Sequence, residues 1–212
     1  MKANDILSRL FIVLSLLASF LLFSVTVKAN NSPEPQNLVQ RSIDKMLLAL
    51  KENEDKIAKD PDAVFELVET ILMPNFDFAK MAKLALGKNW RKTTAEQKQR
   101  FTKEFRLLLV RTYSTAMLEY ANEEIRLLPF KGDIKKKKVK VKMEMIQPGG
   151  PSIPMALSMY LNNDTGWKVY DVKIDGISLI TSYRSTFSSQ IRNNGMDKLI
   201  ESLASRNEKV KA

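Results

Sequence analysis

The chain has 212 residues, which is enough for one domain with a substantial hydrophobic core. It contains no histidine and no cysteine, which excludes Ser-His and Cys-His catalytic pairs, histidine or thiolate metal ligands, disulfides and a lipid-modified cysteine. The formal net charge is +10 at pH 7, of which residues 1–29 contribute +2 (Lys2, Arg9 and Lys28 against Asp5). After export and loss of these residues, the remaining charge of about +8 indicates anionic lipid head groups or an acidic protein partner rather than nucleic acid.

The first 29 residues have the pattern of a signal peptide. Lys2 and Arg9 are followed by the apolar run Leu10–Phe23, and Val27-Lys28-Ala29 supplies the small or short residues that signal peptidase reads. A run of about fourteen residues is shorter than the roughly twenty that span a bilayer. We therefore expect cleavage after residue 29 and export to the periplasm, with an uncleaved membrane anchor as the alternative.

The first part of the mature chain is predicted to be helical. Apolar residues recur with helical spacing over 39–50 and again over 64–72, where Asp60-Pro61 marks a helix start. We expect one phospholipid-binding domain over 30–208, in which the ends, 30–36 and 204–212, are flexible.

Two more helices follow. A short one over 78–86 ends at Gly87. Thr93 and Glu96 have the spacing of a capping box, which predicts that the longest helix begins there and runs over 95–121.

After the long helix the hydrophobic pattern changes from a helical period to a period of two, which predicts strands separated by tight turns. The expected strands are 125–130, 139–145, 153–161 and 166–174. Helical spacing returns over 179–203, interrupted near Gly195. Helices, then a meander of strands, then helices predict an α+β fold with helices on one face of a curved antiparallel sheet.

The last of these strands carries two aromatic residues of opposite parity, Trp167 and Tyr170. They face opposite sides of the sheet if no bulge intervenes. We expect Tyr170 to face the helices together with Val172 and Ile174.

One face of the two central strands is rich in methionine. Its residues are Met143, Met145, Met155, Leu157, Met159 and Leu161. Methionine is unbranched and polarizable, so such a face suits a wall that contacts variable acyl chains. An ordinary core that happens to use methionine is the alternative, because apolar strand faces are usually core.

The densest charge run is Lys135–Lys138, continued by Lys140 and Lys142. It suits anionic head groups or an acidic partner. It equally suits a solvated hairpin edge, where lysines discourage edge-to-edge pairing, and we favour that interpretation for most of these residues.

No carboxylate pair, phosphate-binding glycine loop, metal-ligand spacing or nucleophile motif stands out. We therefore expect no catalytic residue, no metal and no cofactor. Two other classes stay open: an isomerase-like enzyme that uses Asp171 with Tyr113 or Tyr183 on an apolar substrate, and a basic adaptor that docks membrane complexes.

Three stretches share their order, spacing and length with a known family. They are Phe76-Asp77-Phe78 through Leu84–Trp90, Gln97–Tyr120 with Leu109–Tyr113, and Trp167–Val172 with Gly176–Leu179 and Tyr183-Arg184-Ser185. In these stretches the chain resembles the MlaC family of periplasmic phospholipid-binding proteins, which includes the toluene-tolerance proteins.

The resemblance implies an α+β fold of the nuclear-transport-factor type and a deep apolar pocket that holds acyl chains as cargo. It also implies a monomeric carrier that shuttles phospholipid between an outer-membrane lipoprotein complex and an inner-membrane ABC transporter, which maintains outer-membrane lipid asymmetry. The expected lipid-binding residues are Phe78, Met81, Trp90, Leu109, Tyr113, Met143, Met145, Met155, Leu157, Met159, Val172, Leu179, Tyr183 and Phe187.

Overall fold

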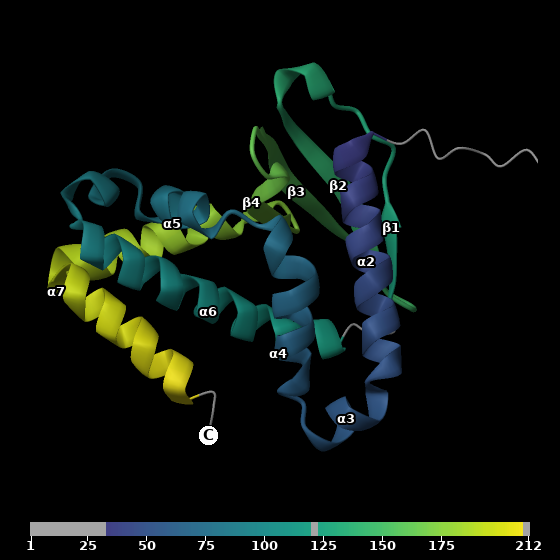
Figure 1. The fold of residues 1–212 in the computed structure, drawn as a ribbon, viewed down its shortest axis with the longest axis horizontal. Coiled ribbons are helices and arrows are strands. Elements are labelled where there is room, and N and C mark those ends of the chain that lie inside the picture. Colours follow the sequence, from purple (N-terminus) through teal and green to yellow (C-terminus); the bar gives the residue numbers. More distant parts are fainter. Residues whose placement is uncertain (1–32, 120–122, 210–212) are drawn as a thin grey trace, which may run out of the picture. The chain divides into compact units, whose positions relative to one another are not determined.

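The computed structural model describes residues 33–119 and 123–209, and the predicted leader lies outside these ranges (Figure 1). The helices are α2 (Glu34–Glu52), α3 (Glu54–Lys59), α4 (Ala63–Leu67), α5 (Phe78–Leu86), α6 (Ala95–Glu119) and α7 (Leu179–Lys209). The strands are β1 (Glu124–Leu127), β2 (Lys138–Ile146), β3 (Ile153–Asn162), β4 (Gly166–Ile174) and β5 (Ile177–Ser178). Over the described ranges, none of the helices combines the length and apolarity needed to cross a membrane.

The strands form one antiparallel sheet in the order β1-β2-β3-β4-β5, which confirms the predicted α+β class. The helix α2 and the segment that contains α4 lie over one face of this sheet (Figure 1). Strand β5 was not predicted, because a strand of two residues carries no periodicity that could reveal it.

A bulge in β4 changes which side chains share a face. Ser158 pairs with Asp171 but Met159 pairs with Val169, so Tyr170 has no partner in β3. One extra residue reverses the side-chain alternation, and Val169 and Val172 therefore belong to the same core cluster although they are three residues apart. The expectation that Tyr170 packs against helices is confirmed, because it contacts the buried side chains of α5, α6 and α7. The expectation that it shares a face with Val172 is wrong, because that required an unbroken strand.

The helices α5, α6 and α7 pack together around aromatic side chains, and we call this group the helical cluster. Its buried members are Met81, Ala82, Ala85, Leu86, Phe101, Phe105, Leu109, Ile180, Phe187, Leu199, Ile200 and Leu203. The ring of Phe105 lies edge-on to Tyr183 and Phe187, with centroids 5.2 and 5.5 Å apart. Helix α7 bends at Gly195, whose φ of 83° is readily adopted only by glycine, and residues on both sides of the bend enter the cluster.

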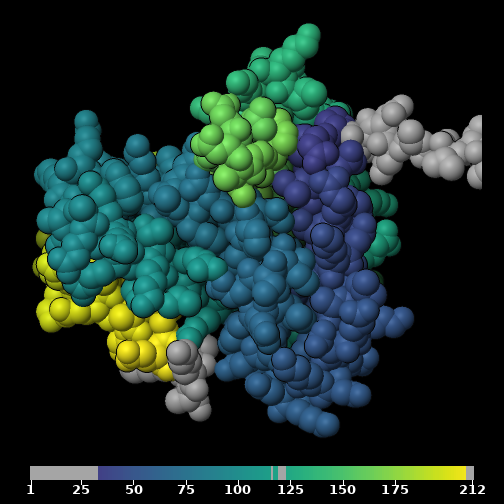
Figure 2. All heavy atoms as spheres, in the orientation of Figure 1, coloured from purple at the N-terminus to yellow at the C-terminus, as the bar shows by residue number. Residues whose placement is uncertain are grey.

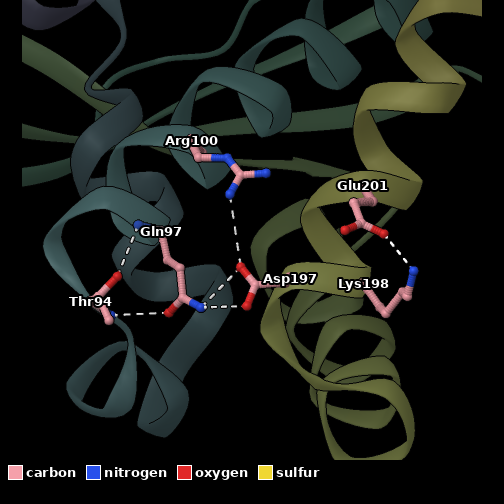
Figure 3. Close-up of polar contacts among 6 residues, drawn as sticks. All are labelled: Thr94, Gln97, Arg100, Asp197, Lys198 and Glu201. Carbon is pink, nitrogen blue, oxygen red and sulfur yellow. Dashed lines mark hydrogen bonds and ion pairs between the residues drawn. The ribbon is translucent and has the colours of Figure 1, made fainter.

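The long helix α6 begins at Ala95 as predicted, but the residues of its capping box are Thr94 and Gln97, each one position later than predicted (Figure 3). The backbone N–H of Gln97 donates to Thr94 Oγ1 (3.2 Å), and the backbone N–H of Thr94 donates to Gln97 Oε1 (3.1 Å). Thr93 is buried, and its hydroxyl donates to a carbonyl four residues earlier, so it is not the cap. The amide of Gln97 also donates to the Asp197 carboxylate at 3.0 and 3.1 Å, which ties the start of α6 to the second half of α7.

Both ends of the domain are helical where the structure describes them. Helix α2 already begins at Glu34, and Pro35 is buried. Helix α7 continues to Lys209, and the buried Asn207 amide donates to the backbone carbonyl (3.0 Å) and the carboxylate (2.8 Å) of Glu104. These contacts hold residues of both ends against the domain.

Candidate functional site

An apolar cavity of about 230 Å³ lies between the sheet and the helices that cover it. Strands β2, β3 and β4 form one wall, and α2, the segment 68–76 and the second half of α6 form the other. Of the 25 described residues that line the cavity, none is charged, and only Ser42, Asn75, Tyr113 and Ser114 carry a polar side-chain group. The lining therefore suits a hydrocarbon ligand.

The polar side chains of the lining are bonded to the protein itself. The hydroxyl of Ser42 donates to the carbonyl of Leu38 (2.8 Å), and the amide of Asn75 donates to that hydroxyl (3.0 Å). The hydroxyl of Ser114 donates to the carbonyl of Val110 (2.6 Å). A ligand is not needed to satisfy these groups, so they do not oppose an apolar one.

The cavity separates parts of the core that would otherwise be joined. Most domains have one contiguous core. Here the sheet side forms one buried cluster around Val141 and Met159, and the α4–α6 side forms another around Val64 and Val68. Both clusters border the cavity, which therefore occupies the place of direct packing between the sheet and these helices.

Ten of the fourteen expected lipid-binding residues line this cavity. They are Phe78, Met81, Leu109, Tyr113, Met143, Met155, Leu157, Met159, Val172 and Leu179. The structure brings these side chains together from α5, α6, β2, β3, β4 and the first residue of α7. Their contact with a lipid remains a proposal.

The other four lie outside the lining. Tyr183 and Phe187 stack on one another and pack in the helical cluster, against which Trp90 is also half-buried. Met145 is buried on β2 between Ile125 of β1 and Ile153 of β3. The spacing of the apolar residues in α7 predicts one buried face, but it does not say which region that face contacts.

Sequence reasoning missed the contribution of α2 and of the segment after α4. From these two regions it missed Leu38, Val39, Ser42, Ile43, Val68, Leu72, Met73, Asn75 and Phe76. On α6, β1 and β4 it also missed Val110, Ser114, Met117, Ile125, Val169 and Ile174. The helical spacing of Val39 and Ile43 was visible, but a helix's apolar face does not reveal what it covers. Val68–Leu72 forms a π-helical turn, and such turns are frequent at functional sites.

Methionine is concentrated at this cavity. Six of the chain's ten methionines line it. They are Met73, Met81, Met117, Met143, Met155 and Met159. Because methionine side chains adapt to irregular shapes, this lining suits a ligand whose chains differ in length or unsaturation.

Two tyrosines meet where the cavity borders the helical cluster. Tyr113 lines the cavity, and both Tyr113 and Tyr183 pack against the helical cluster. Burial is the main cause that raises the pKa of Tyr113, and burial also raises the pKa of Tyr183. Both phenols are therefore neutral at physiological pH.

The carboxylate of Asp171 has a structural role. It accepts hydrogen bonds from the Ser178 hydroxyl at 2.8 and 3.0 Å and from the backbone N–H of Ile180 at 3.3 Å, so it caps the start of α7. In the described part of the chain, no group of three or more acidic side chains is placed to hold a metal ion.

Comparison with known proteins identifies the family. The model of the family described as "MlaC protein" matches residues 40–205. The toluene tolerance protein ttg2D of Pseudomonas putida is 32% identical over 203 residues, which cover 94% of this chain and 91% of that protein. The intermembrane phospholipid transport system binding protein MlaC of Haemophilus influenzae is 27% identical over 196 residues, 92% of this chain and 91% of that protein.

A solved structure has the same fold. It is a phospholipid-binding protein from Ralstonia solanacearum in complex with a phospholipid, and it matches with a TM-score of 0.75 and 28% sequence identity. The match covers 84% of this chain and 98% of that one. From the family match and these relatives, the chain belongs to the MlaC family.

Proposed function

We propose that this protein is a phospholipid carrier that encloses acyl chains in the apolar cavity. The observation that carries the proposal is the lining, in which none of the described side chains is charged and six are methionine. The proposal agrees with the names of the relatives and with the phospholipid bound to the Ralstonia protein.

The energetics favour an enclosed site for such a cargo. Exposing a methylene group to water costs about 0.8 kcal/mol, so a chain of about fifteen costs on the order of 12 kcal/mol. A shallow groove that covered half of the chain would leave about half of that cost in place. A cavity with walls on both the sheet side and the helix side removes most of it.

We infer that the carrier works in the periplasm, after removal of residues 1–29. There it would receive phospholipid from one membrane complex and deliver it to another, between an outer-membrane lipoprotein complex and an inner-membrane ABC transporter. Binding and release require no catalytic group, in keeping with Asp171, whose carboxylate caps α7. The proposed activity is therefore transfer without chemistry on the lipid, and the phospholipid is cargo rather than a cofactor.

Native mass spectrometry of the purified protein tests the proposal. We expect a complex whose extra mass matches phospholipid, and we expect organic extraction to release that lipid. Protein that is free of lipid after mild purification, and that takes up none from vesicles, would contradict the proposal.

A matched pair of variants at Leu157 locates the site. This residue lines the cavity from β3, between Val141 of β2 and Val172 of β4. Leu157→Asp places a carboxylate where water can reach it in an unfilled cavity but where an acyl chain cannot tolerate it, so we expect a folded protein without lipid. Leu157→Met keeps the side-chain volume and should retain lipid.

Circular dichroism and lipid extraction distinguish the outcomes. If Leu157→Asp unfolds the protein, Leu157 is ordinary core and the pocket lies elsewhere. If the variant is folded and holds lipid at the wild-type level, this face of the sheet does not line the binding site.

A further inference from the structure

A strongly basic surface lies away from the cavity, on the connection from β1 to β2 and the first half of β2. Between residues 131 and 142 the sequence has seven lysines and a single acidic residue, Asp133. The lysines, which we call the lysine surface, are Lys131, Lys135, Lys136, Lys137, Lys138, Lys140 and Lys142. All seven are exposed, and none of them lines the cavity.

Little negative charge compensates this surface. No ion pair within the described ranges involves any of its lysines. The carboxylate of Asp133 accepts from the backbone N–H of Lys135 (3.0 Å) and so caps a short helical turn. Glu144, the next acid along β2, is paired with Arg126. The lysine surface therefore carries a positive charge that the described fold does not use.

Protection of a sheet edge explains only part of this charge. Strand β1 pairs with β2 at Met143–Ile146, so lysines on the first half of β2 do guard a free edge. Lys131, Lys135 and Lys136 lie on the connection and not on a strand, where they guard no edge. Between that connection and β2 lies a groove of about 330 Å³, bordered by four of the lysines and by Tyr170 of β4. The lysines are Lys131, Lys138, Lys140 and Lys142.

The composition of the surface indicates what kind of partner it fits. Protein–protein interfaces are enriched in arginine and aromatic residues and depleted in lysine, and the segment 131–142 has neither arginine nor an aromatic residue. Among the lysines, Ile134 is 49% exposed. It lies in the connection from β1 to β2, which projects beyond α2 and the turn between β3 and β4 (Figure 2). An exposed apolar side chain among lysines suits the interface of an anionic bilayer, where lysines meet the head groups and an apolar side chain can enter between them.

We propose that the lysine surface and Ile134 dock this protein onto anionic phospholipid bilayers. The lysines contact the phosphate-bearing head groups, and Ile134 inserts among them. This inference goes beyond cargo binding, because it rests on a surface that shares no residue with the cavity lining. Docking and cargo binding are therefore separable by mutation.

Co-sedimentation with lipid vesicles tests the proposal, with phosphatidylcholine vesicles compared with vesicles that also contain phosphatidylglycerol. We expect the purified wild-type protein to bind only the anionic vesicles, and to release them at high salt. Lys131→Gln, Lys135→Gln and Lys136→Gln together should weaken binding by about fivefold per lysine, or roughly 100-fold in all. Ile134→Gln should weaken it several-fold.

Each variant has a control of the same chemistry elsewhere. Lys45→Gln, Lys51→Gln and Lys59→Gln remove the same charge from exposed positions on α2 and α3 and should weaken binding only slightly. Ile177→Gln changes another exposed isoleucine, on β5, and should leave binding unchanged.

Several results would overturn the proposal: equal binding to both kinds of vesicle, equal losses in the test and control lysine variants, or binding to an acidic protein without binding to vesicles. Lipid content is measured on the same samples, so that vesicle binding and cargo binding can be compared in each variant. The lysine variant should keep its co-purified phospholipid, and Leu157→Asp should still bind anionic vesicles. If the wild-type protein contains phospholipid but does not bind anionic vesicles, the docking proposal is wrong and the carrier proposal still stands.

Discussion

The helical cluster and the cavity walls are both apolar, but their side chains are packed to different degrees. In the helical cluster, Phe101, Phe105 and Phe187 are at most 2% exposed and contact one another at centroid distances of 5.4 to 5.6 Å. In the cavity wall, Leu157 and Val172 point inward and yet remain only half-buried. Close packing and open space therefore lie in different regions of one domain.

Helix α6 belongs to both regions. Its first half supplies Phe101 and Phe105 to the helical cluster, and its second half supplies Tyr113 and Met117 to the cavity wall. Leu109 lies between them and belongs to both. A change in the first half should therefore affect folding, and a change in the second half should affect lipid binding more than folding.

The largest expected difference comes from the same substitution made in each region. Leu86 is fully buried in the helical cluster, so Leu86→Ala should cost about 3–5 kcal/mol of unfolding free energy. Leu157 faces the cavity and has fewer packing partners to lose, so Leu157→Ala should cost less than about 2 kcal/mol. Urea unfolding of the two variants, freed of lipid, measures both values.

Lipid content should change in the opposite order. Leu157→Ala should reduce the amount of co-purified phospholipid, whereas the folded fraction of Leu86→Ala should retain it. Equal stability losses for the two variants would show that the sheet face is packed like the helical cluster, which would remove the basis of the comparison.

A second, smaller effect concerns the border between the two regions, where Tyr113 and Tyr183 meet. The folded protein raises the pKa of both phenols. Their contribution to stability is therefore fully present below the ordinary tyrosine pKa of about 10. It is lost as the pH rises through the pKa values that the two tyrosines have in the folded protein. The wild-type protein should therefore lose stability at alkaline pH relative to a Tyr113→Phe, Tyr183→Phe variant. Urea unfolding of both proteins over a pH series measures the difference, and parallel curves would mean that these phenols are not buried as described.

The smallest effect is expected at the start of α6, far from the cavity along that helix. Thr94→Ala removes the side-chain oxygen that caps the helix and should cost about 1 kcal/mol, while Thr94→Ser should retain most of the stability. Lipid content should be unchanged in both, because Thr94 acts only on the anchoring of α6. A matching loss of lipid would show that the two halves of the helix do not act separately.

Much of the fold could be predicted because hydrophobic periodicity is a local property. The period of two located β2, β3 and β4, and Gly87 and Gly195 marked a helix end and a bend. The bulge at Tyr170 could not be predicted, because it depends on pairing with β3 rather than on the residues of β4 alone.

The site was predicted in part for a similar reason. Alternation along β2 and β3 placed Met143, Leu157 and Met159 on one face, and the structure places them at the cavity. Helical spacing showed that α2 and α7 each have a buried face, but the tertiary arrangement decides that α2 covers the cavity while Tyr183 of α7 enters the helical cluster.

Photocrosslinking shows where the acyl chain lies in the folded protein, with a phospholipid that carries a photoreactive group at the end of that chain. We predict that the crosslinked peptides come from α2, β3 and the second half of α6, which contain Ile43, Leu157 and Met117 respectively. Peptides around Phe105 and Leu199 in the helical cluster should remain unmodified. Crosslinks concentrated in the helical cluster or on the outer face of the sheet, with none at the cavity, would contradict the account.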